Sequence, residues 1–368
     1  MAMQKTVAFV WENFGPLHVD RCEAVARRGY DVVGIEFASR SNTYDWVPTT
    51  TSFEKITLFE NRSLTGIGEL TLFRNLLPAS VRARARHIFL CHYINPSVFF
   101  SAVALRALGR RVYTMIDSKF DDMPRNIWLE MLKYQLLLPY QGCLVAGTRS
   151  RDYVRFLGMR PERLVPGYDT VAVSRMREGL ESVGSPSFGS RHFTIIARLI
   201  ETKNLKMALD AYGRYVSETA NPHRLVVCGS GHLEAELKAQ VGSLSLQSLV
   251  TFTGFVQTAE VSKVLASTLA LILSSVGETF GQVVLEAVAA GVPVLVSEPC
   301  GARDELVRTG VNGFVFEPDN PEGLALFMAM LSNDQKLWAR MVDAAARFVP
   351  LTDVERFADG VERLIQDA

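Results

Sequence analysis

Residues 270–318 carry the most informative pattern in the chain, ALILSSVGETFGQVVLEAVAAGVPVLVSEPCGARDELVRTGVNGFVFEP. The opening run ALILSS is short and apolar, which predicts a buried strand. VGETFG has the composition of a turn, and QVVLEAVAA predicts a helix that ends at Gly291. A strand, a turn and a helix in this order form the repeating unit of a parallel α/β sheet.

The turn delivers backbone N–H groups to the start of the predicted helix. Thr279, Phe280 and Gly281 would present donors there without intrahelical partners, and the positive end of the helix dipole would attract a diphosphate. Glycine lets such a ligand come close to the backbone. Glu278 precedes the helix and Glu286 lies eight residues further on. Because a carboxylate can accept hydrogen bonds from two neighbouring hydroxyls, this pair suits a ribose diol or a sugar ring.

This segment resembles the signature of glycosyltransferase family 4, two glutamates separated by seven residues within E-x-F-G-x-x-x-x-E-A-x-A-x-G-x-P. The matching residues are Glu278, Phe280, Gly281, Glu286, Ala287, Ala289, Gly291 and Pro293. The resemblance implies that Glu286 binds the donor ribose, and that Glu278 and the following backbone, Thr279 to Gly281, hold the sugar and the phosphates. The alternative is an ordinary helix start with two solvated glutamates, which is common in α/β proteins.

Two cations follow an earlier predicted strand in IIARLIETKNLKMALDAY. Arg198 stands at the strand end and Lys203 in the following loop, where both suit a diphosphate leaving group whose negative charge grows as a glycosidic bond breaks. The segment also resembles the family's R-L-x-x-x-K-N arrangement, matched here by Arg198, Leu199, Lys203 and Asn204. A chance pair of surface cations is the alternative.

Two further turns lie between these segments. Gly229-Ser230-Gly231 follows a strand in LVVCGSGHLEAEL, but Glu234 stands where a dinucleotide fingerprint needs its third small residue. An ordinary tight turn is therefore the favoured interpretation. The second turn contains Gly254 and Phe255, and the family resemblance implies that residues 254–256 border the donor base through their backbone.

The whole chain alternates short apolar runs with longer stretches of helical period, and it does so in two series. A first series of predicted strands lies between residues 6 and 148, and a second between residues 192 and 317. ESVGSPSFGSR, residues 181–191, separates them and has the composition of a linker. With 368 residues and 48% hydrophobic content, the chain is long enough for two cores.

The expected fold is therefore α/β of the GT-B type, with two Rossmann-like domains whose parallel sheets face each other across a cleft. The expected N-terminal, acceptor-side domain covers residues 1–180, and the linker 181–191. The nucleotide-sugar-binding domain is expected at 192–345. Residues 346–368 are expected to be helical and to cross back to the first domain. The family resemblance is dense from about Phe193 to Pro318 and thin before it.

The N-terminal half offers three single candidates. Gly15, after the first strand, would either let donor phosphates approach or simply form a turn. Many family members carry T-x-H-D after a later strand, but this chain has Ile116 in place of the histidine, so that role does not transfer. Asp117 and His92 each end a predicted strand and could contact donor or acceptor. As single residues, both fit a structural role as well.

Composition and segment lengths restrict the partners, the cysteine chemistry and the location that we expect for the protein. Lys plus Arg and Asp plus Glu each total 39, so no global charge draws in nucleic acid or a membrane, and any anion site must be local. Five scattered cysteines in apolar runs predict reduced core residues. No apolar run is long enough to span a bilayer and no leader is evident, so a cytoplasmic location is expected.

The segment LTLFRNLLPASVRARARH, residues 70–87, combines apolar residues with four arginines. It could rest on the inner face of an anionic membrane and meet a lipid-linked acceptor. A packed helix followed by a solvated basic connection is the favoured interpretation, because Pro78 should break the segment.

The sequence therefore predicts a retaining glycosyltransferase that uses a UDP- or GDP-sugar to extend a polysaccharide, lipopolysaccharide or lipid-linked glycan. Family resemblance implies neither metal nor other cofactor, with the donor's own phosphate helping to remove the acceptor proton. Two alternatives use the same domains: a sugar-nucleotide epimerase or hydrolase, and a binding protein without chemistry, which the missing histidine would explain. An NAD-dependent oxidoreductase is disfavoured because no G-x-G-x-x-G opens either domain.

Overall fold

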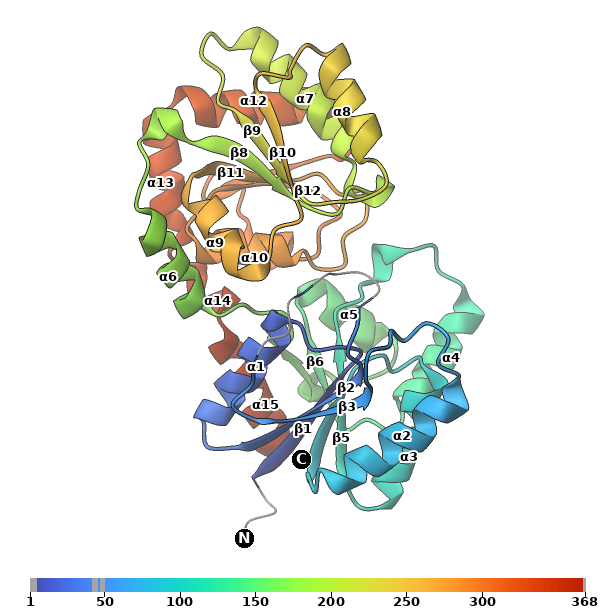
Figure 1. The fold of residues 1–368 in the computed structure, drawn as a ribbon. Coiled ribbons are helices and arrows are strands. Elements are labelled where there is room, and N and C mark those ends of the chain that lie inside the picture. The colour runs from blue at the N-terminus through green and yellow to red at the C-terminus, as the bar shows by residue number, and fades with distance from the viewer. Residues whose placement is uncertain (1–4, 42–45, 47–49, 367–368) are drawn as a thin grey trace. The chain divides into compact units, whose positions relative to one another are not determined.

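The computed structural model describes residues 5–41, 46 and 50–366, and the chain divides into two units. Unit 1 comprises Met1–Ala172 and Val354–Ala368, and unit 2 comprises Val173–Asp353. Each unit is a fully parallel sheet with helices packed on it, as Figure 1 shows. The predicted α/β class with two Rossmann-like domains is confirmed.

The sheet of unit 1 has seven strands in the order β3-β2-β1-β4-β5-β6-β7. The bounds are β1 Thr6–Trp11, β2 Asp31–Ala38, β3 Glu54–Phe59, β4 His87–Leu90, β5 Arg111–Ile116, β6 Cys143–Val145 and β7 Leu164–Pro166. The order reverses direction beside β1, where β2 lies on one side and β4 on the other. Polar residues that follow β1 and β4 therefore meet at one edge of the sheet.

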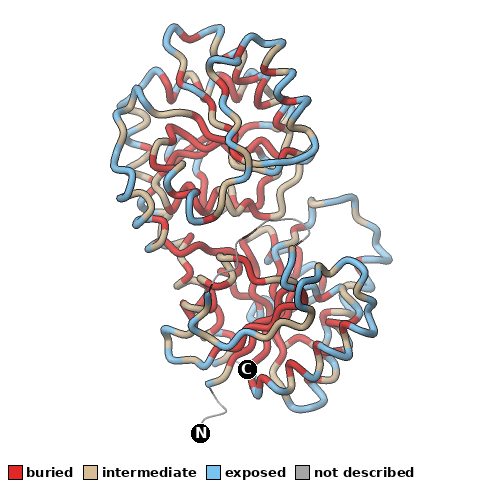
Figure 2. Tube along the Cα trace, in the orientation of Figure 1, coloured by how far each residue is buried: buried red, intermediate tan, exposed pale blue. Residues whose placement is uncertain are grey.

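Side chains of the unit 1 strands alternate between two helical layers. Ala8 and Val10 pack into one core with α2 Glu69–Arg82, α3 Pro96–Ala107, α4 Ile127–Leu137 and α5 Thr148–Phe156. Val7 and Phe9 pack into the other core with α1 Pro16–Arg27 and α15 Val354–Gln366. Figure 2 shows the buried strands running through the middle of the unit. This alternation follows from the two-residue period of a strand covered on both faces.

The last helix, α15, belongs to unit 1 although the chain reaches it from unit 2. It packs against α1, and Arg28 forms ion pairs with Glu355, Asp359 and Glu362 at 2.8–2.9 Å. The chain thus passes between the units at residues 172–173 and again at 353–354. The Ser- and Gly-rich segment 181–191, expected to be the linker, lies inside unit 2.

The sheet of unit 2 has six strands in the order β10-β9-β8-β11-β12-β13. The bounds are β8 His192–Ile196, β9 Leu225–Cys228, β10 Val250–Gly254, β11 Thr268–Leu273, β12 Val294–Ser297 and β13 Gly313–Phe316. One core joins the strands to α7 Leu205–Glu218, α8 Glu234–Ser243, α12 Pro321–Asn333 and α13 Gln335–Ala345. The other helices are α6 Val173–Val183, α9 Thr258–Ala266, α10 Gln282–Ala289, α11 Arg303–Leu306 and α14 Val349–Thr352.

The cysteines, the helix lengths and the segment 70–87 each had a sequence-based expectation. All five cysteines, Cys22, Cys91, Cys143, Cys228 and Cys300, are buried free thiols, as predicted. In the part of the chain that is described, no helix has the length and apolarity to cross a bilayer. The segment 70–87 contains the expected packed helix, but Pro78 lies inside α2 and does not end it. Leu72, Leu76 and Ala79 are buried on either side of the proline, so core packing holds the helix across it.

A buried ion pair in unit 1 provides a test of this architecture. Arg21 of α1 and Asp169 lie 3.1 Å apart with side chains only 2% and 5% exposed, and Arg21 also stacks over the Tyr168 ring. Asp169→Ala would leave a buried cation without its partner, so the free energy of unfolding should fall by about 3 kcal/mol. Urea denaturation measures this loss. The exposed Arg27–Glu355 pair is the control, because Arg27→Ala should cost less than about 1 kcal/mol; equal losses would contradict the prediction.

Candidate functional site

Four of the predicted segments converge at the carboxyl edge of the unit 2 sheet. β10, β9, β8 and β11 are adjacent and parallel, so the residues that follow them meet at one edge. Arg198 follows β8, Gly229 follows β9, Gly254 ends β10 and Glu278 lies in the turn after β11. The structure therefore brings together segments that are up to 80 residues apart in sequence.

The turn between β11 and α10 has the geometry of an anion-binding helix start. Gly281 is the residue before α10, with a φ of 105°, and it supplies no side-chain cap to the helix. Glycine is required by this left-handed conformation, and a helix start without a side-chain cap leaves N–H groups for another acceptor. Phe280 is buried beneath the turn, and Glu286 is buried one helical turn into α10, with 7% of its surface exposed.

Lys203 and Glu278 form an ion pair that ties the loops after β8 and β11 together. The Lys203 ammonium donates to Oε2 of Glu278, and Ser275 Oγ donates to the same oxygen at 3.1 Å. Two further contacts join the loops: Ser274 Oγ donates to the Lys203 carbonyl at 2.8 Å, and the Val276 N–H to the Thr202 carbonyl at 2.9 Å. The two predicted residues are thus a positioned cation and carboxylate beside the start of α10.

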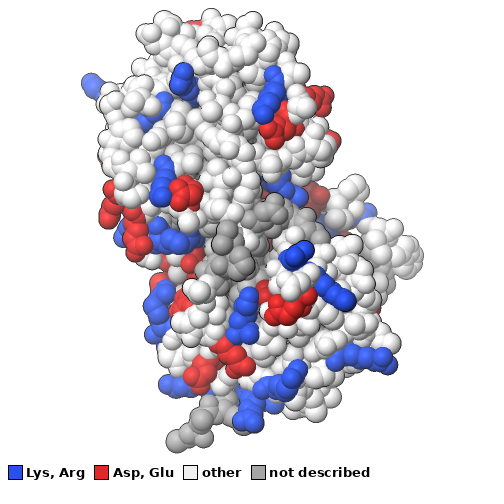
Figure 3. All heavy atoms as spheres, in the orientation of Figure 1, with Lys and Arg blue, Asp and Glu red and all other residues white. Residues whose placement is uncertain are grey.

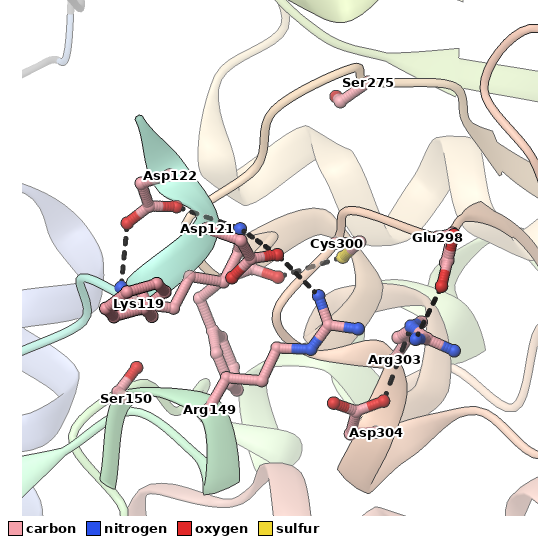
Figure 4. Close-up of polar contacts among 12 residues, drawn as sticks. Lys119, Asp121, Asp122, Arg149, Ser150, Ser275, Glu298, Cys300, Arg303 and Asp304 are labelled. Carbon is pink, nitrogen blue, oxygen red and sulfur yellow. Dashed lines mark hydrogen bonds and ion pairs between the residues drawn. The ribbon is translucent and has the colours of Figure 1, made fainter. Parts of the chain in front are cut away.

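A third loop, residues 297–302, supports this turn and was missed by the sequence analysis. Backbone N–H groups of Gly301 and Ala302 donate to the carbonyls of Glu278 and Phe280, at 3.2 and 2.8 Å. Ser297 Oγ donates to the Ser275 carbonyl at 2.6 Å. Figure 4 labels Ser275 and Cys300 of this region. The available signal was Gly301 in VSEPCGA. A glycine beside a strand often marks a place where another backbone segment approaches closely.

The remaining predicted residues of unit 2 have distinct surroundings. Arg198 is exposed, two residues beyond β8. Gly254 has a φ of 76° with open space beside it, and Phe255 is 39% exposed. Gly229 packs differently, because a β-carbon there would lie 1.8 Å from the Ala197 carbonyl oxygen. That contact supports the tight-turn interpretation of the Gly229-Ser230-Gly231 segment.

The three candidates in unit 1 lie after β1, β4 and β5. The Trp46 ring fills the space beside Gly15, since a β-carbon on that glycine would lie 2.4 Å from it. His92 has a φ of 54°, and its Nε2 is 3.7 Å from a carboxylate oxygen of Glu12. Asp117 is exposed immediately after β5. The proposed roles of these residues stay predictions.

A polar cluster next to Asp117 was also missed from the sequence. Lys119 is fully buried, and its ammonium lies 3.0 Å from Asp122 and 3.2 Å from Asp121. Arg149, in the first turn of α5, pairs with Asp121 at 3.1 Å, and Figure 4 shows these contacts. Burial alone would raise the pKa of Asp121, but the hydrogen bond and charge of Lys119, with Arg149, lower it. The sequence carries no sign of this cluster, because its charged residues come from separate positions in the chain and follow no regular spacing.

Within residues 5–41, 46 and 50–366, no group of three or more His, Cys, Asp or Glu side chains is placed to hold a metal ion. The expectation of a metal-independent reaction stays a prediction.

Part of the chain matches a known protein family. Residues 187–348 match the family model described as Glycosyl transferases group 1. An uncharacterized glycosyltransferase of Methanocaldococcus jannaschii is 35% identical over 130 residues, which cover 35% of this chain and 33% of that protein. The amylovoran biosynthesis glycosyltransferase AmsK of Erwinia amylovora is 29% identical over 146 residues, covering 38% of this chain and 35% of that protein. The aligned portion is thus about a third of the length of these two curated relatives.

A solved structure extends the likeness to the whole chain. The structure of Anabaena Alr3699/HepE in complex with UDP and glucose aligns with a TM-score of 0.73 at 16% identity, over 98% of this chain and 99% of that one. The fold is therefore that of the GT-B glycosyltransferases. The family model and these relatives are described as glycosyltransferases, and two of the relatives are named for amylovoran and colanic acid biosynthesis.

Gly301 of the supporting loop and Gly277 of the turn between β11 and α10 allow a direct test of the turn geometry. A β-carbon on Gly301 would lie 2.1 Å from the Thr279 carbonyl oxygen, whereas one on Gly277 would meet nothing within 4 Å. Gly301→Ala should lower the free energy of unfolding by about 2 kcal/mol because the backbone must shift. Gly277→Ala is the matched control and should be neutral. Thermal denaturation compares them, and a neutral Gly301→Ala would contradict the close approach.

Proposed function

We propose that this protein is a retaining glycosyltransferase that moves a sugar from a nucleotide-diphosphate sugar, a UDP- or GDP-sugar, to a glycan or lipid-linked acceptor. The observation that carries the proposal is the Lys203–Glu278 pair beside the uncapped start of α10. The complex of the structural neighbour with UDP and glucose supports a nucleotide-sugar donor. Relatives named for amylovoran and colanic acid biosynthesis support a role in polysaccharide synthesis.

The site suits a reaction in which the bond between the sugar and the diphosphate breaks. N–H groups at the start of α10 and the Lys203 ammonium would stabilise negative charge on the leaving diphosphate. Arg198, which follows the adjacent strand, would add a second cation. Glu286 would accept hydrogen bonds from the ribose hydroxyls, and Gly254 and Phe255 would border the base. Glu278, held by Lys203 and Ser275, would contact the sugar.

The resemblance to glycosyltransferase family 4 implies retention of the anomeric configuration. The donor phosphate oxygen would then help to remove the acceptor proton on the same face of the sugar, without a metal. Of the unit 1 candidates, Asp117 would take a catalytic role and His92 would contact the acceptor. Product analysis by NMR should therefore show the same anomeric configuration as the donor, and an inverted product would contradict this mechanism.

Donor binding is the first experiment. A thermal-shift panel of UDP-, GDP-, ADP- and dTDP-sugars without added metal should show stabilisation by one base. Turnover of that donor only in the presence of an acceptor would support the transferase. Turnover without an acceptor would favour an epimerase or hydrolase. Binding with no chemistry would favour a binding protein, as the buried Ile116 in place of the family histidine would allow.

Two substitutions separate binding from chemistry. Glu286→Ala should weaken donor binding about tenfold, because the ribose loses a charged acceptor. Lys203→Ala should mainly lower kcat, by about 10²-fold, because a cation aimed at the leaving diphosphate is lost. Calorimetric titration and initial rates measure the two effects.

The control for these substitutions is a second ion pair of unit 2. Lys206 and Glu236 are both about half exposed and lie 2.7 Å apart. Their alanine variants should retain full binding and turnover. Full activity of both Glu286→Ala and Lys203→Ala would remove the assignment of the site.

A further inference from the structure

Helix α4 of unit 1 has its charged residues turned inward and its apolar residues turned outward. Glu130 is 5% exposed and lies 2.9 Å from the Lys133 ammonium, and the buried Tyr153 hydroxyl donates to Glu130 at 2.7 Å. Every residue of α4 is described, and Gln135 is the one polar residue of the helix that is exposed. The exposed apolar residues, each 45–73% accessible, are Ile127, Trp128, Leu129, Met131, Leu132 and Tyr134.

The apolar surface extends beyond α4 onto its neighbours. Phe120 and Met123, which precede the helix, and Phe156 at the end of α5 are each about half exposed or more. The rings of Phe120 and Phe156 meet edge to face with centroids 5.3 Å apart. We call these three residues and the exposed apolar residues of α4 the α4 face. Single exposed apolar residues are common, but a contiguous group of this size marks an interaction surface.

The charge of the surrounding layer favours an anionic partner. Helices α2, α3, α4 and α5 pack on one side of the unit 1 sheet, and α1 and α15 on the other. The first layer carries seven cationic residues against three acidic ones, whereas the second carries four against five. Several of the cations of the first layer are exposed, including Arg74, Arg82 and Arg106. In Figure 3, blue side chains follow the margin of the unit where Figure 1 places α2.

The dimensions of α4 favour a position along a membrane surface. Its 11 residues give a length of about 16 Å, well short of the ~30 Å hydrocarbon core of a bilayer. Trp128 and Tyr134 are residue types enriched where hydrocarbon meets lipid headgroups. A helix with an apolar outer face, in a layer whose other helices carry exposed cations, matches the pattern of interfacial membrane binding.

We propose that the α4 face docks onto the surface of an anionic lipid bilayer, with apolar side chains entering the headgroup boundary and the arginines of the same layer contacting lipid phosphates. Each apolar side chain buried in this way contributes through the hydrophobic effect, and each arginine near the surface adds electrostatic attraction. Docking of this kind does not depend on the donor, so it can be measured apart from catalysis.

Vesicle sedimentation tests the proposal with the full-length protein. The protein should pellet with vesicles of equal parts phosphatidylcholine and phosphatidylglycerol, and more weakly with phosphatidylcholine alone or at high salt. Trp128→Ser combined with Leu132→Ser should lower the partition coefficient on the order of tenfold or more. Both side chains are exposed, so the melting temperature should be unchanged. Leu326→Ser, at a residue 58% exposed in α12 of unit 2, is the matched control and should bind like the unaltered protein.

Tryptophan fluorescence gives a second readout of the same contact. Trp128 is 73% exposed, so its emission should shift to shorter wavelength when anionic vesicles are added. Trp128→Phe should abolish the shift and retain most of the binding. No pelleting with anionic vesicles would overturn the proposal, as would equal pelleting of the double variant. A dimer that dissociates in the double variant, seen by light scattering without vesicle binding, would assign the α4 face to a second copy of the chain instead.

Discussion

Close approach of backbone segments organises the carboxyl edge of the unit 2 sheet. At Gly229, Gly231 and Gly301, a β-carbon would lie 1.8–2.3 Å from a carbonyl oxygen of another segment. These contacts place the loops after β8, β9, β11 and β12 against one another without side chains between them. Hydrogen bonds such as Leu199 N–H to the Ser230 carbonyl, at 2.9 Å, are formed because the segments are this close. The Lys203–Glu278 pair then depends on loops whose positions the glycines have already set.

This constraint explains how much of unit 2 could be predicted from the sequence. Glycines and apolar runs are local signals, so the strand–turn–helix around Gly281 was recognisable in its residue order. The ion pair of Lys203 with Glu278 was not recognisable from the sequence, because it depends on β8 and β11 being neighbours in the sheet. The support given by Ser297 and Gly301 escaped prediction for the same reason. Sheet order is a tertiary property, and a polar residue far along the chain carries no local sign of its partner.

In unit 1 the failures are of a different physical kind. The edge strands β3 Glu54–Phe59 and β7 Leu164–Pro166 had no predicted counterpart, because β3 is only partly buried and β7 has three residues. Pro78 was expected to end a helix, yet buried residues on both sides of it outweigh its local cost. The Ser- and Gly-rich segment 181–191 was expected to link the domains, and in the structure it lies inside unit 2, Val173–Asp353. Composition identifies a flexible-looking segment, but the packing of a unit decides where it ends.

Helix α4 shows why hydrophobic content alone does not locate a core. Its sequence, IWLEMLKYQLL, would ordinarily bury its apolar residues and expose Glu130 and Lys133. Here the carboxylate of Glu130 has partners on three sides, in Lys133, Arg125 and the Tyr153 hydroxyl, which offset the cost of burying it. Because the charged residues of α4 are paired in the interior, its apolar residues lie at the surface, where their contact with water is unfavourable. The chain has no net charge, so the excess of cationic residues on these four helices is balanced by acidic residues elsewhere in the chain. Apolar exposure and positive charge thus occur in the same helical layer, a combination that a partner both apolar and anionic would satisfy.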